Sequence, residues 1–370
     1  MNWEYEQPVK VIFGNKKREQ IFDIASKMSL KRGFLVCDRF LAEKGIAADL
    51  MSKSKGMIAD VFSDIEPNPT VTSVDTCAAE IRRSKADFVV AMGGGSAMDA
   101  AKAAAVIATT EDSITKYHKT GVALPDVGLP IIALPTTSGT GSEVTPVSVL
   151  TNEKQGFKAP ILGRRLYPVV AIIDPELTYT VPPKVVAQAG LDVLCHAVEG
   201  YMSVKHQPIC DALAIQAARL VFENIEAAVQ KNESAQDNMA LASVMAGLAF
   251  GQPKTGAPHA CSYVLTNRYG IPHGEACALT LDYFVEVAAT KEQERLDFFA
   301  NQVGLEDTFA MTARIRELKE SFGLLTNLKK LGLDEKGITL LVKDSQHPNM
   351  LNSPVEITED ILYKLYRGLV

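Results

Sequence analysis

Three histidines and one aspartate in the second half of the chain have the types and spacing of a metal site. Asp192 and His196 are four residues apart in the helical pattern GLDVLCHAVEG, so both side chains emerge on one face. His259 and His273 lie fourteen residues apart in a chain with only six histidines. Taken alone, the Asp–His pair fits a surface pair or a satisfied core pair. Three imidazoles and one carboxylate together can close around a divalent cation.

The ligand types do not select one metal. Zinc, iron, nickel, cobalt and manganese all accept nitrogen and oxygen donors. A divalent metal acts as a Lewis acid on an alcohol or aldehyde oxygen, so no covalent nucleophile is needed. Cys195 and Cys261 adjoin predicted ligands, but neighbouring helical side chains diverge, and we interpret both cysteines as packing residues.

A glycine turn in the first half predicts a phosphate site. The stretch DFVVAMGGGSAMDAAKAAA runs from strand to helix through Gly93, Gly94 and Gly95. Glycines let the backbone approach a ligand closely, and the amides of a helix starting near Ser96 suit a phosphate or pyrophosphate. Met98 stands where a GxGxxG pattern would have its third glycine, so a plain tight turn is the alternative.

Two further features follow strands of the first half. The loop LPTTSGTGSEVTP, residues 134–146, carries hydroxyl groups and glycines that suit phosphate and ribose oxygens. Asp38 ends the strand GFLVCD, where a carboxylate can accept hydrogen bonds from a ribose and repel a 2′-phosphate. A solvated loop and a turn-forming aspartate are the alternatives. With the glycine turn, these features predict a nicotinamide dinucleotide, with NAD(H) preferred over NADP(H).

The elements that must position these residues differ between the two halves. Short β-branched runs alternate with helical segments up to PVVAIIDPE, which predicts an α/β domain with a parallel sheet and ligands at the carboxyl ends of its strands. Long apolar-periodic stretches follow, which predict an all-α domain. The prolines of VPPK mark the boundary. We therefore expect a dinucleotide-binding domain over residues 1–182 and a helical metal-binding catalytic domain over residues 183–370.

Composition excludes several classes of protein. The net charge of -6 argues against a nucleic-acid surface. The longest uncharged apolar stretch, residues 239–251, is too short to cross a bilayer and is expected to form a buried helix. The first residues lack a secretion signal, and the six cysteines are scattered without a CxxC pair. We expect a cytoplasmic protein with reduced thiols that binds neither nucleic acid nor membrane.

These motifs resemble those of the iron-containing, or group III, alcohol dehydrogenase family over nearly the whole chain. The resemblance is carried by NPT at residues 68–70, GGGSxxDxAK at 93–102, PTTSGTGSE at 135–143, IxDPELT at 172–178, GxDxxxHAxE at 190–199 and the HA…PHG block at 259–274.

The resemblance implies a two-domain enzyme of the architecture shared with dehydroquinate synthase, with NAD(P) in the cleft. It implies one divalent metal, Fe²⁺ or Zn²⁺ with Mn²⁺, Co²⁺ or Ni²⁺ as alternatives, held by Asp192, His196, His259 and His273. It also implies a homodimer or a higher homo-oligomer. The cofactor residues that it implies, besides Asp38 and Gly93, Gly94, Gly95 and Ser96, are Asp99, Lys102, Thr136, Thr137, Thr140, Ser142 and Lys158.

One position departs from the family pattern. Many members have a second histidine four residues after the third ligand, near the substrate, and this chain has Tyr263 there. A phenol donates and accepts hydrogen bonds, but its reference pKa of about 10 makes it a poorer base than imidazole near neutrality. Tyr263 and the ligands His259 and His273 are the candidate catalytic residues. A cofactor ribose hydroxyl or water is the alternative route for the proton.

Several cations lie near the motifs in sequence. Lys254, Arg268 and Arg164, which is followed by Arg165, are candidates for binding an anionic group of the substrate, and surface charges are the alternative. The segment APHACSYVLTNRYGIPHG is similar in sequence to the branch of the family that reduces phosphonoacetaldehyde or sulfoacetaldehyde. One alternative is a general dehydrogenase of neutral short-chain aldehydes, alcohols and diols, such as lactaldehyde, ethanol and propanediol. The other is a non-redox synthase of the dehydroquinate synthase type.

Overall fold

The apolar segments of the first half pair into one sheet in the computed structural model, which describes residues 2–370. The order of this six-stranded sheet is β1-β8-β5-β4-β2-β3, and all of its pairings are parallel. Its strands are β1 Lys10–Phe13, β2 Gly33–Cys37, β3 Ile58–Phe62, β4 Phe88–Gly93, β5 Ile131–Pro135 and β8 Val170–Ile173. The predicted α/β class of this part is confirmed.

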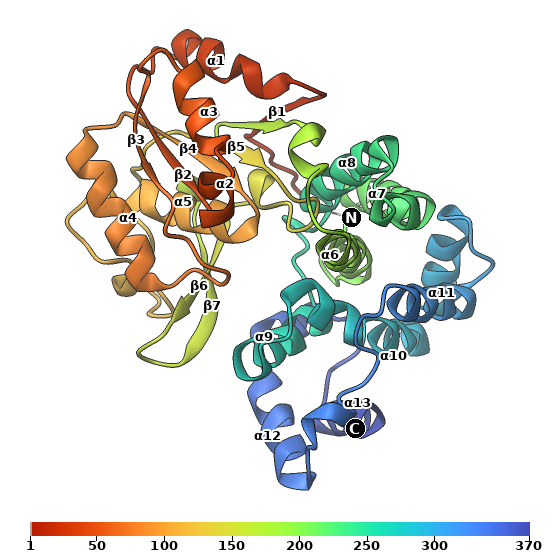
Figure 1. Ribbon diagram of the computed structural model, residues 1–370. Helices are drawn as coiled ribbons and strands as arrows, with labels where there is room; N and C mark the ends of the chain where they lie inside the picture. The colour runs from red at the N-terminus through yellow and green to blue at the C-terminus, as the bar shows by residue number, and fades with distance from the viewer. Residues whose placement is uncertain (1) are drawn as a thin grey trace. The chain divides into compact units, whose positions relative to one another are not determined.

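Helices cover both faces of the sheet (Figure 1). Alternate residues of β2 face opposite sides, because successive strand side chains point in opposite directions. Phe34 and Val36 pack with α4 and α5, whereas Leu35 and Cys37 pack with α1, α2 and α3. The helices are α1 Ile21–Lys27, α2 Arg39–Glu43, α3 Ile46–Lys53, α4 Val71–Ser84 and α5 Gly95–Ile107.

Three strands have weak patterns in the sequence. β3 has the sequence IADVF, in which Asp60 interrupts the apolar run and only Ile58 is buried. β6 Val147–Asn152 and β7 Phe157–Leu162 form a separate antiparallel hairpin, in which Lys158 and Pro160 interrupt the second strand. A half-exposed strand needs few apolar residues, so these segments lack the uninterrupted apolar run of β2 or β4.

The second half of the chain is helical in the described residues, as predicted. One core joins α6, α7, α8, α10 and α11, and another joins α9, α10, α12 and α13. No helix among residues 2–370 combines the length and apolar character needed to cross a membrane. The helices are α6 Pro183–Met202, α7 Pro208–Val229, α8 Glu233–Phe250, α9 Ala257–Tyr269, α10 His273–Gln302, α11 Thr308–Ser321, α12 Glu335–Ser345 and α13 Glu359–Leu369.

The chain divides into two compact units. One unit, called the α/β unit, holds Glu6–Thr137 and Gly141–Thr180. The other, called the helical unit, holds Val181–Val370 with Ser138–Thr140 and the residues before Glu6. Thr140 therefore groups with the helical unit, whereas the other predicted cofactor residues belong to the α/β unit.

Candidate active site

Three strands of the α/β unit end side by side at the predicted nucleotide site. β2 pairs with β3 on one side and with β4 on the other. The order in which strands are added to the sheet therefore changes direction between β2 and β4. Ligands of open α/β sheets bind at such a switch point, beyond the carboxyl ends of the strands. Asp38 follows β2, Gly93 ends β4, and Thr136 and Thr137 follow β5.

The glycine turn after β4 is built so tightly that side chains are excluded. Gly93 has a φ of 149°, and a Cβ there would lie 2.6 Å from the Ala97 Cβ and 2.9 Å from an Asp38 carboxylate oxygen. Gly94 caps α5 without a side chain, and a Cβ there would lie 3.2 Å from the Thr137 hydroxyl. The turn at the start of α5 thus has no room for side chains at Gly93 and Gly94 and lies beside the Thr137 hydroxyl, which suits a pyrophosphate.

The two carboxylate oxygens of Asp38 have different surroundings. Oδ1 accepts a hydrogen bond from the Leu41 N–H at 3.0 Å, which caps α2. Oδ2 is the oxygen that faces Gly93. Burial raises the pKa of Asp38, while backbone N–H groups at the start of α2 oppose the shift. The turn-forming alternative is therefore part of the structure, and it leaves one oxygen beside the predicted phosphate turn.

Asp99, Lys102 and Ser142 form a network that fixes the hydroxyl-rich loop. Lys102 is fully buried, and its Nζ donates to the Ser142 carbonyl and hydroxyl oxygens, each at 2.9 Å. Ser142 Oγ donates to Asp99 Oδ1 at 2.7 Å, and Asp99 Oδ2 accepts from the Val149 N–H at 2.8 Å. Burial lowers the pKa of Lys102 to about 8. These side chains face one another, so they connect α5 to the loop.

Asn68, in a third loop of the α/β unit, connects Lys158 with Ser96 through hydrogen bonds. Lys158 Nζ donates to Asn68 Oδ1 at 2.7 Å, and the Asn68 N–H donates to Ser96 Oγ at 3.2 Å. Asn68 has a φ of 60°, which asparagine tolerates better than most residues. The NPT motif thus joins a cation of β7 to the first turn of α5.

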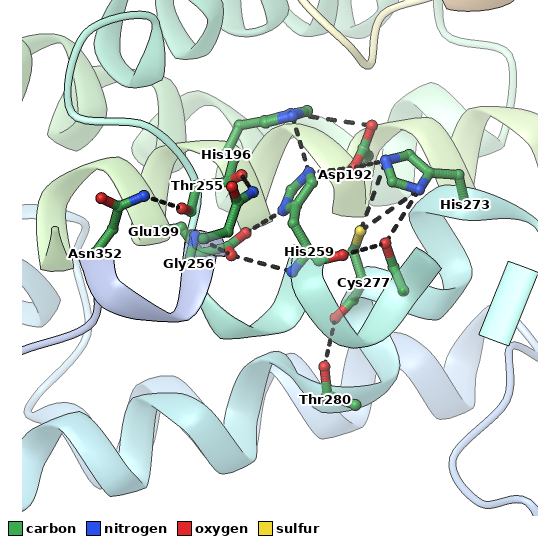
Figure 2. Close-up of polar contacts among 12 residues, drawn as sticks. Asp192, His196, Glu199, Thr255, Gly256, His259, His273, Cys277, Thr280 and Asn352 are labelled. Carbon is green, nitrogen blue, oxygen red and sulfur yellow. Dashed lines mark hydrogen bonds and ion pairs between the residues drawn. The ribbon is translucent and has the colours of Figure 1, made fainter. Parts of the chain in front are cut away.

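The predicted metal ligands converge inside the helical unit (Figure 2). α6 carries Asp192 and His196, α9 carries His259, and α10 begins at His273. Gly270 ends α9 with a φ of 66°, and the short linker to α10 runs back along α9, so that His273 Nδ1 lies 3.3 Å from the Ser262 hydroxyl, one turn after His259. The spacing of fourteen residues therefore corresponds to the rest of α9 and this returning linker.

Three of the predicted ligands, Asp192, His259 and His273, have ligand atoms within 4.8 Å of one another, and His196 joins this group through His259. His259 Nε2 lies 3.0 Å from His196 Nε2 and 3.6 Å from Asp192 Oδ1, and His273 Nε2 lies 4.0 Å from Asp192 Oδ1. The side chains of Asp192, His196 and His259 are 4–6% exposed, whereas that of His273 is 28% exposed. Three of the four predicted ligands are therefore buried, and the cluster is open to solvent beside His273.

The donor atoms of the cluster fit a divalent cation. Asp192 Oδ1 and His196 Nδ1 are buried without a hydrogen-bond partner, and such groups are costly unless another ligand satisfies them. Burial lowers the pKa of His196 to about 4, so its ring is neutral at pH 7. Burial alone would raise the pKa of Asp192, but the three neighbouring histidines outweigh it and hold that pKa below its ordinary value. A carboxylate among imidazole nitrogens is a suitable metal environment.

Two residues that the sequence did not single out join this cluster. Cys277 lies one helical turn after His273, and its sulfur and the ligand atoms of Asp192, His259 and His273 all lie within 4.8 Å of one another. Glu199 lies one turn after His196 and contacts His259 (Figure 2). The i, i+4 and i, i+3 spacings of these two residues were the available signals.

The three predicted anion-binding cations have different surroundings. Arg268 is nine residues after His259, which places it on the opposite side of α9, and it pairs with Asp344. Arg164 is 69% exposed and pairs with Glu6 at 2.7 Å. Lys254 is half-buried just before α9, and its Nζ donates to the Gly251 carbonyl at 2.6 Å. Of the three predicted cations, Arg268 therefore lies on the side of α9 that faces away from the ligand His259.

Tyr263 lies one turn beyond His259 on α9. Its ring is nearly parallel to that of His273, with 6.4 Å between the ring centroids, and lies 5.0 Å from the ring of His347. The phenol therefore belongs to the open, His273 side of the cluster. A second imidazole, from the segment before Pro348, adjoins it.

Most of the chain matches two models of one protein family. The model of the iron-containing alcohol dehydrogenase matches residues 8–175, and that of the Fe-containing alcohol dehydrogenase family, C-terminal, matches residues 186–370. The chain belongs to the iron-containing alcohol dehydrogenase family. It is thus a nicotinamide-dependent oxidoreductase that acts on alcohols or aldehydes, and the predicted family is confirmed.

Relatives within the family cover nearly the whole chain. The crystal structure of sulfoacetaldehyde reductase from Bifidobacterium kashiwanohense in complex with NAD⁺ is 53% identical, with a TM-score of 0.97 over 100% of this chain and 99% of that one. Sulfoacetaldehyde reductase of Bilophila wadsworthia is 32% identical over 86% of this chain and 84% of its own length. Long-chain-alcohol dehydrogenase 1 of Geobacillus thermodenitrificans is 33% identical over 95% of this chain and 92% of its own length.

Proposed function

We propose that this enzyme is a metal- and NAD(H)-dependent reductase of a small anionic aldehyde of the sulfoacetaldehyde or phosphonoacetaldehyde type. The observation that carries the proposal is the 53% identity to a sulfoacetaldehyde reductase over the whole chain. A general alcohol dehydrogenase is the second candidate, because the relative named for long-chain alcohols is 33% identical.

For the metal, we propose that Asp192, His196, His259 and His273 hold one divalent ion, Fe²⁺ or Zn²⁺, with Mn²⁺, Co²⁺ and Ni²⁺ as alternatives. When bound, the metal would polarise the substrate oxygen and the nicotinamide would exchange the hydride. The protein contributes a buried carboxylate, the neutral imidazole of His196 and one open side at His273. Exclusion of water from such a site strengthens the electrostatic interactions within it.

For the cofactor, we propose that the turn Gly93, Gly94, Gly95 and Ser96 holds the pyrophosphate, with the hydroxyls of Thr136, Thr137 and Thr140 as further hydrogen-bonding groups. Lys158 adjoins Ser96 through Asn68. Asp99, Lys102 and Ser142 act by holding the loop in place, because their polar atoms are satisfied by one another. Cofactor binding thus belongs to residues 1–182 and metal binding to residues 183–370.

Replacing Asp38 with glycine is expected to weaken the preference for NADH over NADPH by at least about tenfold, or about 1.4 kcal/mol. The reason is loss of the carboxylate that would accept ribose hydrogen bonds and repel a 2′-phosphate. Glycine at an N-cap costs only a few tenths of a kcal/mol, so α2 should persist. The ratio of kcat/KM for the two cofactors measures the effect. Asp38→Asn, which keeps the cap and removes the charge, separates repulsion from folding; an unchanged ratio in both variants would refute this role.

The substrate proposal is tested by NADH oxidation with purified, metal-reconstituted enzyme. Sulfoacetaldehyde and phosphonoacetaldehyde would be compared with lactaldehyde and propanal. We expect at least a hundredfold preference for an anionic aldehyde, which corresponds to about 2.7 kcal/mol. Equal or higher kcat/KM for the neutral aldehydes would make the enzyme a general short-chain alcohol dehydrogenase.

Lys254 is the cation of the helical unit that we propose to bind the anionic group. Burial lowers its pKa, and the charge of Lys205 lowers it further, so an anion near this ammonium would relieve both effects. In the same assay, Lys254→Met should raise KM for sulfoacetaldehyde and leave KM for propanal unchanged. A parallel change for both aldehydes would assign Lys254 to folding alone, and would move the anion site to another cation such as Arg164.

Tyr263→Phe is expected to lower kcat by about 10²-fold, the lower end of the range for a group that transfers a proton. The variant keeps the ring against His273 and His347 and removes only the hydroxyl. Turnover and metal content would be measured together. Unchanged kcat with full metal content would mean that the proton travels through a cofactor ribose hydroxyl or water.

We also propose a cytoplasmic homodimer or higher homo-oligomer. The six cysteines are free and buried, which suits a reducing compartment. β1 lies at an edge of the sheet and exposes Val11 and Phe13, and such an edge favours pairing with another chain. Sedimentation velocity tests the assembly, and a monomer at micromolar concentration would contradict it.

A further inference from the structure

We propose that Glu199 is a positioning residue, which fixes the ring orientation and the tautomer of His259 so that its Nε2 presents a lone pair to the metal. The inference rests on the proposed metal site. It concerns a residue of α6 that is none of the four proposed ligands.

Glu199 is aimed at His259 and at the backbone that carries it. Its side chain has no exposed surface, and its Oε2 accepts a hydrogen bond from His259 Nδ1. Its Oε1 accepts from the Gly256 N–H at 2.9 Å and from the His259 N–H at 3.2 Å. Figure 2 shows these contacts converging on one carboxylate. Both oxygens therefore face donors, and all three donors belong to the start of α9.

The position of Glu199 on α6 follows from helical spacing. Asp192, His196 and Glu199 are separated by four and then three residues, so they share one face of the helix. The two proposed ligands of α6 and Glu199, the partner of His259, thus lie on one face of the same helix. The carboxylate also supplies the cap that Gly256 lacks as the N-cap of α9.

The carboxylate selects one of the two neutral tautomers of His259. A neutral imidazole carries one N–H, and an acceptor at Nδ1 places that hydrogen on Nδ1. Nε2 then has a lone pair where it lies 3.0 Å from His196 Nε2 and 3.6 Å from Asp192 Oδ1. The other tautomer would set the Nδ1 lone pair against a carboxylate oxygen. A hydrogen bond from a carboxylate to a ligand's second nitrogen also raises the basicity of that ligand.

Glutamine at this position would satisfy only part of the arrangement. An amide has one oxygen and one NH₂ group, whereas Glu199 presents two acceptor oxygens. With its NH₂ toward His259 Nδ1, the glutamine would favour the tautomer with hydrogen on Nε2, which opposes metal binding. With its NH₂ toward the two backbone N–H groups, donors would face donors at the start of α9. Glu199→Gln therefore changes hydrogen bonding at nearly constant volume.

The test is the affinity of the metal-free protein for Zn²⁺, measured by competition with a chelating dye. Glu199→Gln should bind Zn²⁺ about 10–100-fold more weakly than the unaltered protein. Glu275→Gln is the matched control: Glu275 is also buried and close to a proposed ligand in sequence, but its partners are Gln188 Nε2 at 2.7 Å and the Leu325 N–H at 2.8 Å. Its affinity should change less than threefold. Equal affinities of Glu199→Gln and the unaltered protein would overturn the inference.

A second measurement needs no variant at position 199. Nitrogen-15 NMR of the metal-free, unaltered protein at pH 8 should show His259 with hydrogen on Nδ1, the signal being assigned by its loss in His259→Asn. Hydrogen on Nε2 would overturn the inference even if Glu199→Gln fails to fold. Failure of the proposed metal site would look different, because His259→Asn would then bind Zn²⁺ as tightly as the unaltered protein.

Discussion

Replacing His259 with alanine is expected to weaken metal binding by more than about 100-fold and to lower turnover at least as much. Partners of a ligand already contribute about 10–100-fold to metal affinity, so a ligand itself should contribute more. His259 Nε2 is also the nitrogen that lies nearest to both His196 and Asp192. Metal content after dialysis and kcat would be measured on the same preparation.

A buried histidine of the α/β unit provides the control for this variant. His118 is 2% exposed, and its Nε2 bonds the Ala159 carbonyl at 3.1 Å. His118→Asn should retain the full metal content. Full metal-dependent activity in His259→Ala would defeat the ligand assignment.

Gly274→Ala is expected to unfold or displace the start of α10 and to abolish tight metal binding. A Cβ at Gly274 would lie 2.2 Å from the backbone oxygen of Gln188 and 3.0 Å from the Asp192 Cβ. A backbone oxygen within α6 cannot move aside cheaply, so α10 must shift and carry His273 away from Asp192. Overpacking of this kind costs about 1–3 kcal/mol or more. The midpoint of thermal unfolding and Zn²⁺ affinity measure the two effects.

The same substitution at another helical glycine serves as the control. Gly368 lies in α13, and a Cβ there would meet nothing within 4 Å. Gly368→Ala should leave metal affinity unchanged and stabilise the protein by about 0.5–1 kcal/mol. If Gly274→Ala behaves like Gly368→Ala, close packing of α10 on α6 is not what holds His273 in place.

The buried strands and the long helices were the parts of the fold that the sequence predicted well. The buried strands β2, β4, β5 and β8 are continuous apolar runs, and α6, α7 and α8 repeat apolar residues at helical spacing. β3 and the β6–β7 hairpin have no such apolar run, because they are partly exposed and contain polar residues or proline. Exposure relaxes the demand for apolar side chains, so the pattern weakens where burial does.

The sequence also predicted which residue types gather at the site. Asp192 and His196 could be placed together because helical spacing determines their relation. His259 and His273 could be placed with them only by their chemistry. Their proximity depends on the turn at Gly270, which reverses the chain between α9 and α10.

What the sequence determined by itself was therefore local: the helical and strand segments, the glycine turn at Gly93, the ligand types and the family motifs. The tertiary structure decided which side chains face one another. It made Lys102 a buried support of a loop, paired Arg268 with Asp344, and set Glu199 against His259. The physical reason is that backbone periodicity acts over a few residues, whereas burial, hydrogen-bond partners and tautomers depend on contacts between segments distant in the chain.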